Sequence, residues 1–209
     1  MDVQFYGANA LVLSYKGTRV VVDDNLAALG GKSVLKANDT VLYTGEHDAP
    51  GVDARLVVDR PGEYEVGDVS IVGVAARAHM SEDEKSKAAT MFKITAGDIN
   101  VLVTGHVYPD ISEAQLEALG KVDVMIVPVG GMGYTLDAIG ALKLIKEVEP
   151  KLVIPTHYAM KGLNYPMPQA DLDVALKELG LEPKETTAKL RLKPADFGEA
   201  TQLIVLEKS

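Results

Sequence analysis

Short apolar runs recur along this chain, and in its second half they alternate with segments of helical spacing. Such runs, bounded by Gly, Pro and polar clusters, are typical of strands, whereas apolar residues three and four apart indicate helices. Two β-layers with helices outside, an α/β design, would bury both patterns. We expect one domain over residues 1–209, a length suited to a single core. The expected strands are 3–6, 10–15, 19–23, 40–44, 54–59, 64–66, 69–75, 90–94, 99–104, 122–127, 152–154, 189–192 and 202–206; the expected helices are 112–119, 136–148 and 169–179.

Composition limits the classes of function. The chain has no cysteine, so it has neither a disulfide framework nor a thiolate metal site. A net charge of −9 argues against a basic face for nucleic acid, and no apolar run has the length of a membrane span. No secretory signal is recognisable, and we expect a cytoplasmic protein. A small molecule is the expected substrate or ligand, and the oligomeric state is left open.

Two segments lack regular patterning. Residues 81–87 are charged and non-periodic, which predicts an exposed and mobile loop. Residues 160–168 contain Met, Tyr and Pro, and we interpret them as a loop packed over the mouth of a pocket rather than as a partner-binding surface.

The chain has only four histidines, and each follows an apolar run. Strand-end loops are where a rigid scaffold commonly presents functional side chains, and imidazole is the commonest protein metal ligand. One interpretation is therefore a metal centre or the remains of one. The alternative is a set of unrelated surface or capping residues. The four are His47, His79, His106 and His157.

Several segments, in order, resemble the metallo-β-lactamase superfamily and within it the branch of ascorbate-6-phosphate lactonase-like hydrolases. The segment 41–50 (VLYTGEHDAP) lies where the family carries its T-H-x-H-x-D-H metal motif. The segments 61–67 (PGEYEVG), 128–138 (PVGGMGYTLDA) and 153–158 (VIPTHY) are similar to later family signatures. The resemblance implies a four-layer αβ/βα sandwich.

The chain departs from this family at the expected metal ligands. Gly45, Ala49 and Pro50 stand where the motif has His, Asp and His, so that only His47 clearly survives there, with Asp48 beside it as a substitute. His106 takes the place of the bridging Asp. An imidazole offers one lone pair to one metal, whereas a carboxylate can bridge two.

The resemblance therefore implies at most one metal ion, Zn or Mn, or none. His47, His79 and His106 with a water would form a three-histidine zinc site, and His157 would be a fourth ligand or a substrate contact. The supporting residues are Asp48, Asp23, Tyr134 and Asp137: Asp23 matches a structural Asp of the family, and Asp137 or Thr135 would cap the following helix.

Two hypotheses of function remain open. The first is a metal-dependent hydrolase of lactones, esters or phosphoesters with an eroded, degenerate site, weakly active or inactive. The second is a non-catalytic binding or interaction module on the same fold. The simultaneous loss of the ligands at 45, 49 and 50 favours an impaired site in either case, and the catalytic residues stay unassigned.

Overall fold

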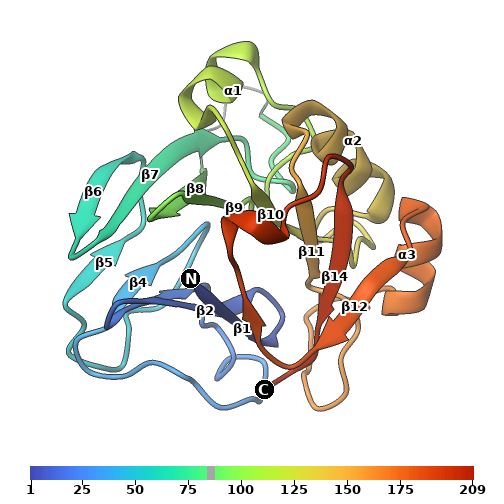
Figure 1. The fold of residues 1–209 in the computed structure, drawn as a ribbon. Helices are drawn as coiled ribbons and strands as arrows, with labels where there is room; N and C mark the ends of the chain where they lie inside the picture. Colours follow the sequence, from blue (N-terminus) through green and yellow to red (C-terminus); the bar gives the residue numbers. More distant parts are fainter. Residues whose placement is uncertain (84–87) are drawn as a thin grey trace.

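The computed structural model describes residues 1–83 and 88–209, and within these ranges the chain forms two β-sheets with α-helices beside the second (Figure 1). The α/β two-sheet architecture predicted from the sequence is confirmed. The α-helices of the described residues are α1 (Glu113–Leu119), α2 (Ala138–Val148) and α3 (Leu172–Leu179). α1 contacts β7 and α2 contacts β10, so the helical layer lies on the second sheet.

The first sheet is built mainly from the N-terminal third of the chain. Its central hairpins turn at Gly7-Ala8 and at Lys16-Gly17, all of which have positive φ, as tight turns between short strands require. Pairing is antiparallel from β1 to β3 and parallel from β3 to β5. In spatial order the strands are β13 (Leu190–Arg191), β1 (Asp2–Gly7), β2 (Ala10–Tyr15), β3 (Thr18–Val22), β4 (Thr40–Leu42) and β5 (Leu56–Val58).

The second sheet combines an antiparallel half with a parallel half. β6 to β9 pair antiparallel, whereas β9, β10, β11, β14 and β12 run parallel. Its order is β12 (Pro183–Thr187), β14 (Gln202–Leu206), β11 (Leu152–Thr156), β10 (Val124–Pro128), β9 (Ile99–Val103), β8 (Ala89–Ala96), β7 (Val69–Ala76) and β6 (Gly62–Val66).

One large apolar cluster holds the sheets together. It contains residues of the first sheet such as Phe5 and Leu13 and residues of the second such as Phe92 and Leu102, all at most 2% exposed. At about 25 cal/mol per Å² of buried apolar surface, this continuous burial is the main stabilising contribution to the fold.

The helix ends follow local sequence signals. Ser112 and Gln115 form a capping box at the start of α1, and Gly120 ends that helix. The Asp137 carboxylate caps α2 by accepting a hydrogen bond from the Gly140 N–H at 2.7 Å, as predicted. Thr135, the other candidate cap, has a buried hydroxyl without a partner among the described residues.

Two features differ from the sequence-based expectations. The polar segment Pro183–Thr187 forms β12, which was not predicted. Its residues are mostly exposed, so they show no apolar pattern, and the strand is held by pairing with β14 rather than by burial. α3 starts at Leu172, three residues later than expected, after the N-cap Asp171. In the charged segment 81–87, Glu82 and Asp83 are exposed and lie outside helices and strands, as predicted, and residues 84–87 lie outside the described residues.

Replacing a large core side chain tests this account of the fold. Phe92→Ala is expected to lower the free energy of unfolding by about 3–5 kcal/mol, because it leaves a cavity in the cluster shared by both sheets. Ile139→Ala, at a side chain 69% exposed on α2, serves as the control and should change stability by no more than about 0.5 kcal/mol. Urea denaturation followed by circular dichroism measures both, and similar losses in the two variants would contradict the assignment of the core.

Candidate functional site

The candidate site lies where the carboxyl ends of parallel strands from both sheets meet. Pro128 of β10 pairs with Thr156 of β11, so the residues that follow both strands lie side by side. His157 directly follows β11, and His106 follows β9 after a two-residue turn. From the first sheet, Asp23 follows β3 and Thr44 lies two residues beyond β4. Crevices beyond the carboxyl ends of strands are common ligand sites in α/β proteins.

Two of the four histidines form a close pair at this place. The imidazoles of His106 and His157 are nearly perpendicular, with ring centroids 4.5 Å apart. The Tyr134 ring lies 5.4 Å from the first and 5.7 Å from the second, centroid to centroid. Tyr165 closes the outer side of His157 at 5.1 Å. The structure thus brings together three residues that the sequence nominated: His106, His157 and Tyr134.

The rings of His106, His157 and Tyr134 line a small pocket. Its volume is about 50 Å³, enough for a few water molecules or a small polar group but not for a whole drug-sized ligand. Asn9 and Asp23 contribute polar lining, and Pro166 lies at the same pocket. The segment 160–168 therefore packs against the pocket, as expected of a covering loop.

Two polar atoms near the pocket have no partner among the described residues. They are Nδ2 of Asn9, a residue 3% exposed, and Nδ1 of His106. The amide oxygen of Asn9 accepts a hydrogen bond from the Thr156 hydroxyl at 2.8 Å, which fixes the orientation of the amide. Because buried polar groups in proteins are almost always hydrogen-bonded, these two atoms are suited to a polar ligand or water.

Burial keeps the paired imidazoles neutral. It lowers the pKa of His106 to about 3, with further lowering by the charges of His157 and His79. Burial also lowers the pKa of His157 to about 4, against the opposing effect of its hydrogen bond to Gln169. At neutral pH the pocket therefore presents uncharged rings, each with one donor and one acceptor nitrogen.

The network around Gln169 assigns the tautomer of His157. The Gln169 amide nitrogen donates to the carbonyls of Met167 and Pro168, at 3.0 and 3.1 Å. Its amide oxygen must then accept from Nδ1 of His157, at 3.1 Å. Nδ1 carries the proton, and Nε2 keeps the free lone pair.

His157 also has a left-handed backbone, with φ of 52°. Its N–H donates to the Ala8 carbonyl at 2.8 Å, and a Cβ on Gly130 would stand only 2.0 Å from its carbonyl oxygen. His157 can occupy this position only because Gly130 has no side chain.

The rings of the other two histidines pack on other aromatic side chains. His79 is half-buried beside Tyr108, and its N–H donates to the His106 carbonyl at 2.8 Å. Burial lowers its pKa. His47 stacks on Tyr43, with centroids 3.7 Å apart, and its Nε2 lies 3.6 Å from an Asp59 carboxylate oxygen. Neither ring lines the pocket of His106 and His157.

The candidate supporting residues have distinct roles. Asp23 is buried, and its carboxylate accepts hydrogen bonds from the N–H and the hydroxyl of Thr44, at 2.7 and 2.6 Å. Desolvation raises its pKa to about 6, although the bonds from Thr44 oppose the shift. Asp48 is exposed, and its carbonyl lies 2.8 Å from Nδ1 of His47. Asp137 caps α2.

Across the described residues, no three His, Cys, Asp or Glu side chains are grouped so that they could hold a metal ion. Nor is any described helix long and apolar enough to cross a bilayer. Sequence reasoning missed Asn9 and Gln169, because neither belongs to a ligand motif. The only local signal was the turn at Gly7, which carries Asn9 between two strands.

The fit of Gly130 against His157 can be tested directly. Gly130→Ala is expected to lower the free energy of unfolding by about 1–3 kcal/mol, because the new methyl group overlaps a backbone carbonyl. Gly45→Ala is the control, since a Cβ there meets nothing within 4 Å. Thermal unfolding compares the two, and a stable Gly130→Ala protein would refute the predicted overlap.

The neutral state of the pocket gives a pH prediction. Because the folded pKa values of His106 and His157 are lowered, the stability these groups contribute is present above the unfolded pKa near 6.5 and is lost as pH falls towards 4 and 3. Nitrogen-15 NMR of the imidazoles should show neutral rings, with Nδ1 of His157 protonated, between about pH 5 and 8. An imidazolium signal from either ring in this range would contradict the assignment.

Comparison with known proteins identifies the family. Residues 2–157 match the β-lactamase superfamily domain. A UPF0173 metal-dependent hydrolase of Salinibacter ruber is 36% identical over 150 residues, covering 68% of this chain and 64% of that protein, so the match spans less than two thirds of the relative. A UPF0173 protein of Pyrococcus furiosus is 32% identical over 181 residues, 76% of this chain and 83% of the relative.

A solved structure agrees with the fold. A proposed Zn-dependent hydrolase of the metallo-β-lactamase superfamily from Thermotoga maritima superimposes with a TM-score of 0.74 at 24% identity, covering 99% of this chain and 98% of that one. Together with the two-sheet architecture and the match over residues 2–157, these likenesses show that the chain belongs to the metallo-β-lactamase superfamily and is homologous to its UPF0173 metal-dependent hydrolases.

Proposed function

We propose that this chain is a member of the hydrolase family whose metal site is eroded, so that it hydrolyses lactones, esters or phosphoesters weakly or not at all. The observation that carries the proposal is the chemistry of the site. The first family loop contributes one imidazole, which stacks on Tyr43 beside Asp59, and the bridging position holds a buried imidazole instead of a carboxylate.

The side chains present do not fit the two-metal centre of the family. Gly45, Ala49 and Pro50 offer no ligand atoms in their side chains. Both oxygens of Asp23 accept hydrogen bonds from Thr44, which leaves this carboxylate engaged in holding the β4 loop. No step of hydrolysis is therefore assigned to a metal here.

The paired histidines are also poor replacements for a metal-activated nucleophile. An effective general base has a pKa near the working pH, whereas those of His106 and His157 are lowered to about 3 and about 4. Hydrolysis by these side chains alone would be slow. The likeness of residues 128–138 and 153–158 to ascorbate-6-phosphate lactonase-like hydrolases makes a phosphorylated lactone the first substrate to assay.

A second candidate function is a non-catalytic binding module on the same fold. The unpartnered Nδ2 of Asn9 and Nδ1 of His106 favour it, because both are free to hydrogen-bond a polar group in the pocket. A ligand held there would contact the neutral side chains of Asn9 and His106 rather than a cation.

Restoring the family ligands is the sharpest test. Tag-free wild-type protein purified without chelator should carry well below one Zn or Mn ion per chain by elemental analysis. The variant Gly45→His/Ala49→Asp/Pro50→His/His106→Asp should bind about two, because it restores the ligand types of a dinuclear centre. A Cβ at Gly45 has open space, so the loop can accept the new side chain.

Activity completes this test. Wild-type turnover of a lactone, ester and phosphoester panel should stay near background, with or without added Zn or Mn. The control His47→Ala should leave metal content and turnover unchanged. One tightly bound metal ion per wild-type chain, together with turnover that His47→Ala or His157→Ala abolishes, would refute the eroded site.

A further inference from the structure

A second and larger cavity lies away from the histidine pocket. Its volume is about 590 Å³, within the size range of small-molecule sites, and it shares no lining residue with the smaller pocket. It opens between the segment 31–36, which follows β3, and the residues Lys208 and Ser209. In Figure 1 the C-terminal end of the chain lies beside the blue loop that contains this segment.

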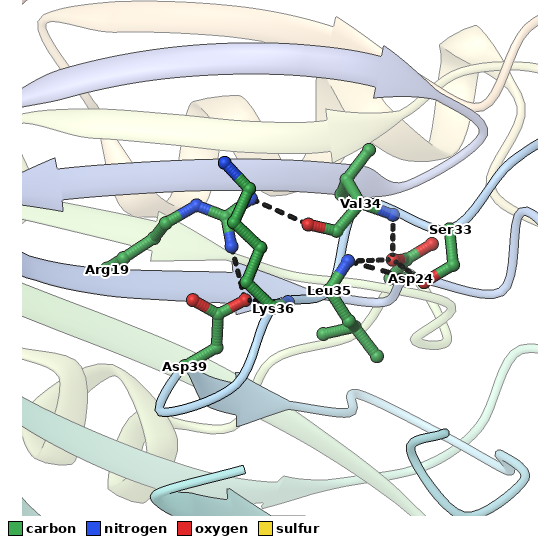
Figure 2. Close-up of polar contacts among 7 residues, drawn as sticks. All are labelled: Arg19, Asp24, Ser33, Val34, Leu35, Lys36 and Asp39. Atoms are coloured by element: carbon green, nitrogen blue, oxygen red, sulfur yellow. Dashed lines mark hydrogen bonds and ion pairs between the residues drawn. The ribbon is translucent and has the colours of Figure 1, made fainter. Parts of the chain in front are cut away.

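Two buried carboxylates fix one wall of this cavity (Figure 2). Asp24 accepts hydrogen bonds from the N–H groups of Val34 and Leu35, at 2.6 and 3.0 Å, and from the hydroxyl of Ser33 at 2.8 Å. Asp39 accepts from the N–H of Lys36 at 2.7 Å. The N–H groups of Val34, Leu35 and Lys36 already donate hydrogen bonds within the protein, so this wall is preorganised. The side chains of the segment remain available to contact a ligand.

The lining is rich in cations although the whole chain has a net charge of −9. The Arg19 guanidinium is committed to the wall, because it donates to Asp39 and to the Val34 carbonyl. Lys32, Lys36 and Lys208 also line the cavity, and their ammonium groups make no hydrogen bond or ion pair with any described residue.

The cavity also has apolar lining residues. Leu26 and Leu163 line it and belong to a small hydrophobic cluster separate from the main core, and Tyr6 packs against the same cluster. Leu26 and Leu163 are 3% and 8% exposed, so most of each side chain is packed against the protein. The cavity therefore combines apolar lining residues with a group of unpaired cations.

We propose that this cavity binds a small organic anion, with its carboxylate or phosphate group at Lys32, Lys36 and Lys208 and its apolar part against Tyr6, Leu26 and Leu163. The inference goes beyond the proposed function and is independent of any activity of the histidine pocket. A nucleic acid is a poor candidate, because the negative charge of the rest of the chain would repel a polyanion.

A charge-matched ligand series tests the proposal by NMR. Phenylphosphonate and benzoate should shift the backbone amides of residues 31–36, 208 and 209, and rising salt should weaken both interactions. Benzyl alcohol, the neutral counterpart, should bind much more weakly. Equal binding of all three compounds, no binding of the anions, or shifts centred on His106 and His157 would overturn the proposal.

Paired variants locate the anion. Lys32→Gln/Lys36→Gln should weaken binding of phenylphosphonate roughly tenfold by removing two unpaired charges. The control Lys146→Gln/Lys177→Gln makes the same change in net charge on the exposed faces of α2 and α3 and should leave the affinity unchanged. Circular dichroism confirms that both proteins are folded. Equal weakening in the two variants would show a general charge effect and refute the site.

Discussion

The site depends on the backbone link that joins the two sheets at His157. The N–H of this residue donates to the Ala8 carbonyl in the turn between β1 and β2, and the hydroxyl of the preceding Thr156 donates to Asn9 of the same turn. The end of β11 is thereby fixed against the first sheet. The left-handed φ of His157 and the close approach of Gly130 follow from this link, because the chain must turn sharply where the sheets meet.

The same junction explains the electrostatics of the pocket. Side chains that follow strands of two packed sheets are shielded from water, so desolvation dominates their pKa values. Desolvation lowers the pKa of His106 and His157 and raises that of Asp23, and in each case it favours the uncharged form. Neutral imidazoles can form hydrogen bonds or bind a single metal ion, whereas the two-metal centre of the family also needs a carboxylate that bridges the ions. The proposed loss of metal-dependent hydrolysis rests on the absence of that carboxylate at His106 and of ligand side chains at Gly45, Ala49 and Pro50.

In the larger cavity, by contrast, charged side chains line the site. Asp24 and Asp39 are engaged in holding the loop, and the lysines that border the cavity are left unpaired. A locally cationic cavity in an acidic protein concentrates the field on a small ligand. The cavity shares no lining residue with the pocket between the sheets, so its ligand can differ without disturbing that pocket.

The sequence by itself determined the α/β class, the superfamily, the side-chain cap before α2 and the placing of His157 at a strand end. These features depend on local periodicity, on backbone conformation or on short motifs. Only the tertiary structure decided that His106 and His157 form a pair while His47 stacks on Tyr43, because ring positions depend on packing between residues far apart in the chain. It also decided that β12 is a strand, that Asn9 and three lysines line pockets, and that Gln169 hydrogen-bonds His157. Burial and convergence arise when separate strands and loops meet, and no local pattern encodes them.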